Sequence, residues 1–103
     1  MSVTAEDIAF VEDLFAPLGP ITYRKMMGGL TIYCEGQVFA IFDRQGTVFL
    51  KAKGTFAETL DNAGSRQFGP EDGGRMGYWT LPEDALDDPD TASDWARQAL
   101  AHI

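Results

Sequence analysis

The chain has 103 residues and a net charge of -8, with 45% hydrophobic residues, one cysteine and one histidine. This length allows one domain with one core, because typical domains hold about 100–150 residues. The single cysteine excludes an internal disulfide and a cysteine-rich zinc site. No apolar run approaches the roughly 18–20 residues that cross a bilayer, and no basic leader opens the chain, so we expect a cytoplasmic protein without membrane association.

The acidic charge is concentrated at the two ends of the chain. Residues 1–23 hold four acids and no Lys or Arg, and residues 76–103 hold six acids and one arginine. The middle, residues 24–75, holds seven bases and six acids. A negative net charge opposes nonspecific binding to nucleic acid and to anionic membranes. The acidic ends fit either solvated helix faces or a surface that docks a basic protein patch.

An opening helix is predicted in "TAEDIAFVEDLFAPLG", residues 4–19. Thr4 and Asp7 have the spacing of a capping box, and apolar residues then recur at helical intervals. Pro17 and the Gly-Pro pair that follows end the pattern. One face of this helix should enter the core, while its acidic residues stay in water.

Three strands are predicted next, in "LTIYCE" (30–35), "VFAIF" (38–42) and "TVFLKAK" (47–53). The first alternates between apolar and polar residues, whereas the second is apolar on both faces, as a central strand is. The short connections at Gly36 and Gly46 force neighbouring strands to pair antiparallel. We expect a three-stranded meander, entered at Gly28 and Gly29 through a backbone conformation that a side chain would resist.

The second half of the chain alternates between helix and strand. Thr55 and Glu58 form a second predicted capping box, and Gly64 is placed to end that helix. The segment "RMGYWTL", residues 75–81, has the composition of a strand. Asp88 should cap a final helix that begins with a proline. The expected apolar stripe of this helix consists of Ala92, Trp95, Ala96, Ala99 and Leu100.

The expected order is therefore helix, three strands, helix, one or two strands, helix. Helices that are segregated on one face of an antiparallel sheet define an α+β fold, here a two-layer sandwich.

Few residues suit the common kinds of active site. The Gly-Gly pair after Arg24 and Lys25 precedes a strand and lacks the Lys-Ser or Lys-Thr of a phosphate-binding loop. His102 is the only histidine, and Cys34 has no partner at ligand spacing, so the sequence assembles neither a metal centre nor a nucleophile with its base. We predict no catalytic residues, no metal and no cofactor.

Bases and aromatic residues between positions 24 and 79 are the candidate binding residues. The predicted interaction or anion site consists of Arg24, Lys25, Tyr33, Arg75, Tyr78 and Trp79. If these residues lie on an exposed part of the sheet, they contact another protein. If they line a pocket between helix and sheet, they bind a small ligand or substrate. A stacking platform with a basic rim would bind nucleic acid directly, which the acidic ends disfavour.

Two stretches of the sequence also carry a family resemblance: "RKMMGGLTIYCEGQVFAIFDRQGTVFLKAK" and "GRMGYWTLPEDALDDPDTASDWARQAL". Together they resemble the N-terminal domain of the TfoX/Sxy competence-regulator family over essentially the whole chain. The shared motifs are an Arg, a Met and Gly-Gly before the first strand, then G-x-x-F-A, a third strand that contains Leu-Lys, and a late Y-x-x-L-P. Met27 stands where an aromatic residue is usual, and Trp79 where a second Tyr is common.

The resemblance implies an α+β fold like that of the type III secretion chaperones, and a role in transcriptional regulation. Full-length members act as co-activators with the cyclic-AMP receptor protein on DNA-uptake genes, and they carry a C-terminal helical domain that these 103 residues do not include. We therefore expect a stand-alone domain, residues 1–103, that acts through a protein partner such as the transcription machinery. By analogy with the chaperones, we also expect a homodimer. The family offers no catalytic residues to transfer.

Overall fold

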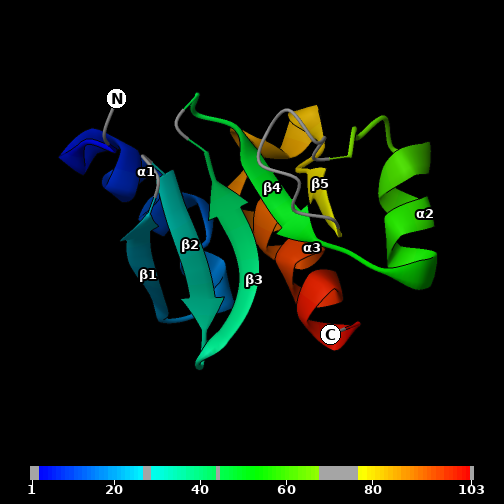
Figure 1. The fold of residues 1–103 in the computed structure, drawn as a ribbon, viewed down its shortest axis with the longest axis horizontal. Helices are drawn as coiled ribbons and strands as arrows, with labels where there is room; N and C mark the ends of the chain where they lie inside the picture. The colour runs from blue at the N-terminus through cyan, green and yellow to red at the C-terminus, as the bar shows by residue number, and fades with distance from the viewer. Residues whose placement is uncertain (1–2, 27–28, 44, 68–76, 103) are drawn as a thin grey trace.

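The computed structural model describes residues 3–26, 29–43, 45–67 and 77–102, which form two layers (Figure 1). In these segments a five-stranded antiparallel sheet makes one layer, and helices pack on one of its faces. The helices are α1 (Ala5–Leu14), α2 (Gly54–Asn62) and α3 (Pro89–Ala101), with short 3-10 helices η1 (Ala16–Leu18) and η3 (Glu83–Ala85). The strands are β1 (Ile21–Met26), β2 (Gly29–Cys34), β3 (Gln37–Phe42), β4 (Val48–Lys51) and β5 (Tyr78–Thr80). The predicted α+β sandwich is confirmed.

The strands lie in the sheet in the order in which they occur in the chain, β1-β2-β3-β4-β5, and every neighbouring pair is antiparallel. The predicted meander is confirmed, and β3 is indeed the central strand. The predicted order of elements was wrong in one respect, because it lacked β1. This strand lies at the edge of the sheet, and residues 22–25 are all exposed. An edge strand that buries so little need not show the apolar alternation by which strands are recognised.

A β-bulge in β3 brings an additional aromatic ring into the core. Ile32 pairs with Ala40 and Tyr33 pairs with Val38, so Phe39 is the extra residue between the two pairs. Phe39 and Ala40 are both fully buried, although consecutive residues of a regular strand point to opposite faces. The Phe39 ring packs edge to face on the ring of Phe15, with 5.2 Å between centroids. The bulge therefore helps to join the sheet to the segment that follows α1.

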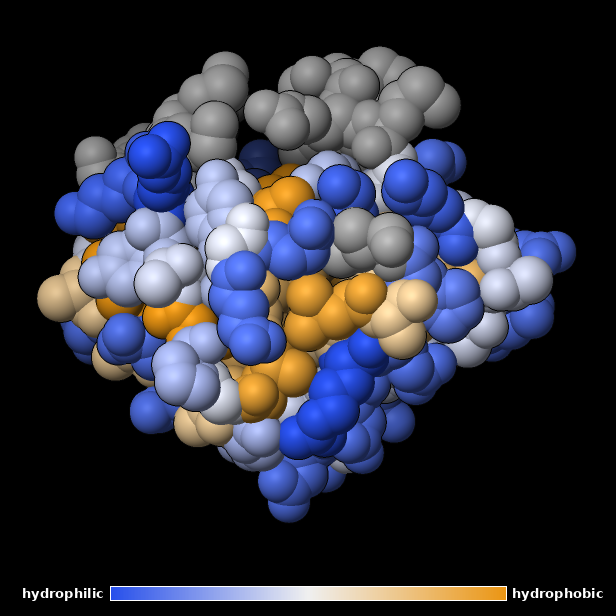
Figure 2. Space-filling model, turned by 90° about the horizontal axis from the view of Figure 1, so that it is seen from below, coloured by the Kyte–Doolittle hydropathy of each residue, from blue (hydrophilic) through white to orange (hydrophobic). Residues whose placement is uncertain are grey.

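The main core lies between the sheet and the helices. Small side chains on α3, namely Ala92, Ala96 and Ala99, are fully buried and let this helix approach the sheet closely. Trp95 and Leu100, the other two members of the predicted stripe, are only partly buried. Seen from below the view of Figure 1, apolar residues are visible across the middle of the molecule and are bordered by hydrophilic ones (Figure 2). Apolar residues thus form part of the surface at this end.

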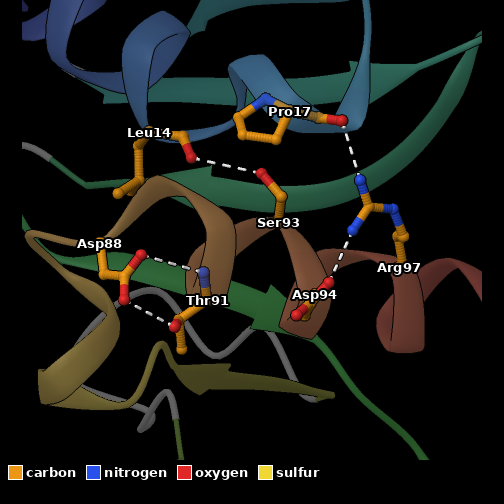
Figure 3. Close-up of polar contacts among 7 residues, drawn as sticks. All are labelled: Leu14, Pro17, Asp88, Thr91, Ser93, Asp94 and Arg97. Carbon is orange, nitrogen blue, oxygen red and sulfur yellow. Dashed lines mark hydrogen bonds and ion pairs between the residues drawn. The ribbon is translucent and has the colours of Figure 1, made fainter.

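Two polar contacts tie α3 to the segment at the end of α1 (Figure 3). Ser93 is fully buried, and its hydroxyl donates to the Leu14 carbonyl oxygen at 3.4 Å. Arg97 donates to the Pro17 carbonyl oxygen at 2.8 Å and forms an ion pair with Asp94 at 2.6 Å. These bonds satisfy carbonyl groups at a helix terminus, where intrahelical partners are lacking. They fix α3 relative to α1 and η1.

The ends of α1 and α2 test the predicted caps. The capping box of Thr4 and Asp7 is present. The predicted box of Thr55 and Glu58 is wrong, because α2 already begins at Gly54 and its N-cap, Lys53, makes no side-chain capping bond.

Gly64 ends α2 as predicted. It has φ +92°, and its N–H donates to the Asp61 carbonyl oxygen at 3.0 Å. The next N–H, that of Ser65, donates to the Leu60 carbonyl oxygen at 3.0 Å. This pair of bonds is a Schellman motif, which glycine favours because it lacks the Cβ that penalises a positive φ.

The first turn of α3 depends on Asp88, as predicted. Its carboxylate accepts hydrogen bonds from the Thr91 hydroxyl at 2.8 Å and from the Thr91 backbone N–H at 3.3 Å (Figure 3). The hydroxyl bond, followed by the backbone bonds, lowers the pKa of Asp88 below its ordinary 3.8. Because the pKa is lower in the folded state than in the unfolded state, this cap stabilises the protein fully above about pH 4 and is lost as the pH falls through the lowered value.

We therefore expect the effect of Asp88→Ala to depend on pH. Near pH 7 the substitution should lower the midpoint temperature of thermal unfolding, and near pH 2 the variant and the parent protein should nearly coincide. Circular dichroism at both pH values measures this difference. Asp87→Ala is the matched control, since Asp87 is an exposed neighbour outside the cap. A destabilisation of equal size at both pH values would contradict the role of the charged cap.

Within the described segments, no helix has both the length and the apolar character that crossing a membrane requires.

Candidate functional site

The sheet has one face covered by helices and one that no described helix covers (Figure 1). The pairing of β1 with β2 and β3 shows which side chains point away from the helices. Arg24 pairs with Thr31, which pairs with Ile41, and Thr22 pairs with Tyr33. The neighbours of Thr31 and Ile41 along β2 and β3, such as Ile32, are buried in the main core on the opposite side. We call Thr22, Arg24, Thr31, Tyr33 and Ile41 the open face.

Toward β4 and β5, aromatic side chains on this side of the sheet are buried. Phe49 is fully buried, and with Tyr78 it forms a second, small hydrophobic cluster against which Ile41 packs. The guanidinium of Arg66 lies over the Phe49 ring, 5.5 Å from its centroid, at the distance of a cation–π contact. The exposed side chains of the open face are those of Thr22 and Arg24 on β1.

The structure brings together only some of the predicted site residues. Arg24 and Tyr33 lie on the adjacent strands β1 and β2 and share the open face. Tyr78 points to the same side but belongs to the cluster at the far end of the sheet. Trp79 packs against the main core instead, because neighbouring residues of a strand face opposite sides. Arg75 lies outside the described residues.

This distribution bears on the predicted pocket between helix and sheet. The space between the two layers is occupied by the buried side chains of the main core. Trp79 adjoins that space, whereas Arg24, Tyr33 and Tyr78 point to the other side of the sheet. The described members of the predicted lining therefore do not face one another.

The outer edge of the sheet, formed by β1, carries two adjacent bases. Arg24 and Lys25 are exposed, and among the described residues neither has an ion pair. Lys25 pairs with the core residue Leu30, so it points to the helix-covered side while Arg24 points to the open face. Tyr23 lies between β1's polar residues and is 38% exposed. We call Tyr23, Arg24 and Lys25 the basic edge.

Sequence reasoning missed part of this edge, because it did not predict β1. Thr22 was not among the predicted site residues. A signal was present in the run Ile21 to Tyr23, since β-branched and aromatic residues favour strands.

Cys34 and His102 are of the residue types most often used in catalysis, but their contacts are those of structural residues. Cys34 is half-buried, and burial, together with the negative charge of Glu35, raises the pKa of its thiol. A raised pKa keeps the thiol protonated at neutral pH, which lowers its reactivity as a nucleophile. The ring of His102 stacks on Phe56, and its Nδ1 lies 2.8 Å from the Gln98 carbonyl oxygen. In the described part of the chain, no cluster of three or more His, Cys, Asp or Glu residues is placed to hold a metal ion.

Comparison with known proteins identifies a family. Residues 13–103 match the family model of the TfoX N-terminal domain. Comparisons with curated proteins and with solved structures give no significant match. The matched region contains all five described strands together with α2 and α3. Because the match spans most of the chain, this protein belongs to the TfoX N-terminal domain family.

Proposed function

We propose that this domain is a non-catalytic protein-interaction module that acts in transcriptional regulation in the cytoplasm. The observation that carries the proposal is the match of residues 13–103 to the TfoX N-terminal domain. The sequence motifs described above resemble competence regulators, which act as co-activators beside a DNA-binding protein. A domain of this kind works by contact with another protein rather than by a chemical reaction of its own.

The basic edge supports this proposal physically. Arg24 and Lys25 are exposed and lack ion pairs with described residues, in a chain whose net charge is -8. Local charge opposite to the overall charge directs a partner to one orientation, because complementary potentials set the register of an interface. The acidic remainder of the chain disfavours binding to nucleic acid at the same time.

The proposal predicts a stable protein partner. Tagged protein captured from its own host at moderate salt, followed by mass spectrometry, should recover a transcription factor or an RNA polymerase subunit. Deletion of the gene should change transcript levels, and restoring the gene should reverse the change. Recovery of the tagged protein alone, with unchanged transcripts in the deletion strain, would reject the regulatory module.

A further inference from the structure

The two edges of the sheet differ in how they are covered. Beyond β5, the Thr80 N–H donates to the Arg66 carbonyl oxygen at 3.0 Å, and the Arg66 N–H donates to the Thr80 hydroxyl at 3.0 Å. Gln67 also forms a β-bridge with Trp79. The preceding chain therefore protects this edge. On the opposite side, β1 pairs with β2 alone among the described strands, and its other edge faces outward (Figure 1).

The backbone of β1 is suited to accept another strand. It is six residues long, contains no proline and pairs with β2 without a register shift. Proline, bulges and very short length, which are among the usual means of preventing an edge from pairing, are absent from β1. Charged side chains are another such means and are present in Arg24 and Lys25, which oppose a strand of like charge but not an acidic one. Along such an edge, alternate residues direct N–H and C=O groups outward, where an extended peptide can bond to them.

We propose that the outer edge of β1 binds an extended acidic segment of a partner protein, which adds to the sheet as a further strand. This inference rests on the proposed interaction function and names its surface and the chemistry of its partner. An added strand has side chains on both faces of the sheet, as β1 does. One of its residues would therefore lie beside Arg24 on the open face, and the next beside Lys25 on the helix-covered side.

This geometry defines the recognised segment. Two adjacent acids match Arg24 and Lys25, because opposite charges across neighbouring strands stabilise the pair. The residue beside the acids would lie next to Tyr23, whose ring is 38% exposed and offers apolar contact. The expected sequence is an apolar residue followed or preceded by two acids, within an extended segment without proline.

A second copy of this chain matches the same edge poorly. Pairing β1 with another β1 would gather two arginines and two lysines along one shared edge. Like charges on neighbouring strands are destabilising. The charges of β1 therefore favour an acidic partner over self-pairing.

Fluorescence anisotropy with short labelled peptides tests the inference. The probe contains valine and two adjacent glutamates, flanked by threonines, and its counterpart has two lysines in place of the glutamates. We expect the acidic probe to bind with an affinity that falls with salt, and the basic counterpart not to bind. Arg24→Glu with Lys25→Glu should weaken binding by about tenfold or more. Lys53→Glu is the control, since Lys53 is an exposed base at the N-cap of α2, two residues after β4 and away from β1 in the sheet order.

Two N-methylated forms of the probe separate strand addition from charge attraction alone. Methyl groups on alternate nitrogens block hydrogen bonds along one edge of the peptide, and a shifted set blocks the other edge. Strand addition requires that one set abolishes binding and the other leaves it unchanged. In the complex, alternate amides of β1 should also become protected from hydrogen exchange, as measured by NMR.

Three results would overturn the inference. The first is that both methylated probes bind equally well. The second is that Lys53→Glu weakens binding as much as the double substitution on β1, and the third is that sedimentation shows a dimer which the acidic probe dissociates. Capture from the host separates this failure from that of the proposed function. If the transcription partner is still recovered with the Arg24→Glu, Lys25→Glu variant, the interaction module stands and the β1 site is rejected.

Discussion

Replacing Phe39 with alanine should lower the free energy of unfolding by about 3–5 kcal/mol, as expected for loss of a large buried ring. Phe39 is fully buried, and its ring contacts that of Phe15 at 5.2 Å between centroids. The substitution removes this contact and leaves a cavity at the bulge, where neighbouring side chains relax only in part. Since small domains have about 5–15 kcal/mol of net stability, this loss brings the protein close to unfolding.

Phe10→Ala is the matched control, because it deletes the same ring from a site that is 38% exposed. Its cost should be clearly smaller, since the exposed part of the Phe10 ring gains nothing from burial. Urea denaturation followed by circular dichroism gives both free energies. Equal destabilisation by the two substitutions would show that Phe39 does not connect the sheet to the segment after α1 in the way described.

Gly29→Ala should destabilise the protein by about 1–3 kcal/mol, and larger residues should be worse, as for overpacked sites. A Cβ on Gly29 would overlap the Phe42 carbonyl oxygen and approach the Cα of Asp43 to 3.2 Å. These are backbone atoms of β3 and its end, which cannot rotate away. The need for glycine is therefore one of space, which corrects the expectation that backbone conformation explains the pair Gly28 and Gly29. Gly28 itself lies outside the described residues.

Gly36 provides the contrast for this test. It has φ +81°, and a Cβ placed there would meet no atom within 4 Å. Its constraint is conformational, so Gly36→Asn should cost less than Gly36→Ala, since asparagine tolerates this region better. At Gly29 the order should reverse, because asparagine is larger than alanine. Thermal unfolding of the four variants measures both orders, and the same order at both sites would contradict the distinction.

The parts of the fold that could be predicted from the sequence depend on nearby residues. The box of Thr4 and Asp7, the cap at Asp88 and the terminator at Gly64 each involve hydrogen bonds across a few positions. The box at Thr55 failed although its spacing was correct. The N-cap of α2 is Lys53, two residues before Thr55, and the helix begins at Gly54, where φ is +56°. The start of that helix depends on how β4 leads into it, which local spacing does not report.

The candidate site was less predictable, because it depends on which strands exist and how they pair. Arg24 and Tyr33 share the open face only because β1 pairs with β2 in one register, and β1 was not predicted. A shift of one residue would have moved Arg24 to the other side. The separation of Tyr78 from Trp79, in contrast, follows from the alternation of side chains along any strand. Grouping them in one site overlooked a signal that the sequence contained.

The sequential order of the strands also has a consequence for how the chain folds. Strands β1 to β4 are joined by short connections, so each hairpin can form with little loss of loop entropy. Strand β5 is separated from its partner β4 by residues 52–77, and α3 follows β5 in the chain. When the chain emerges from the ribosome, the meander is complete before the helix that covers it has been made. The apolar side of the sheet is then exposed during synthesis and prone to aggregation, until the buried alanines of α3 pack against it.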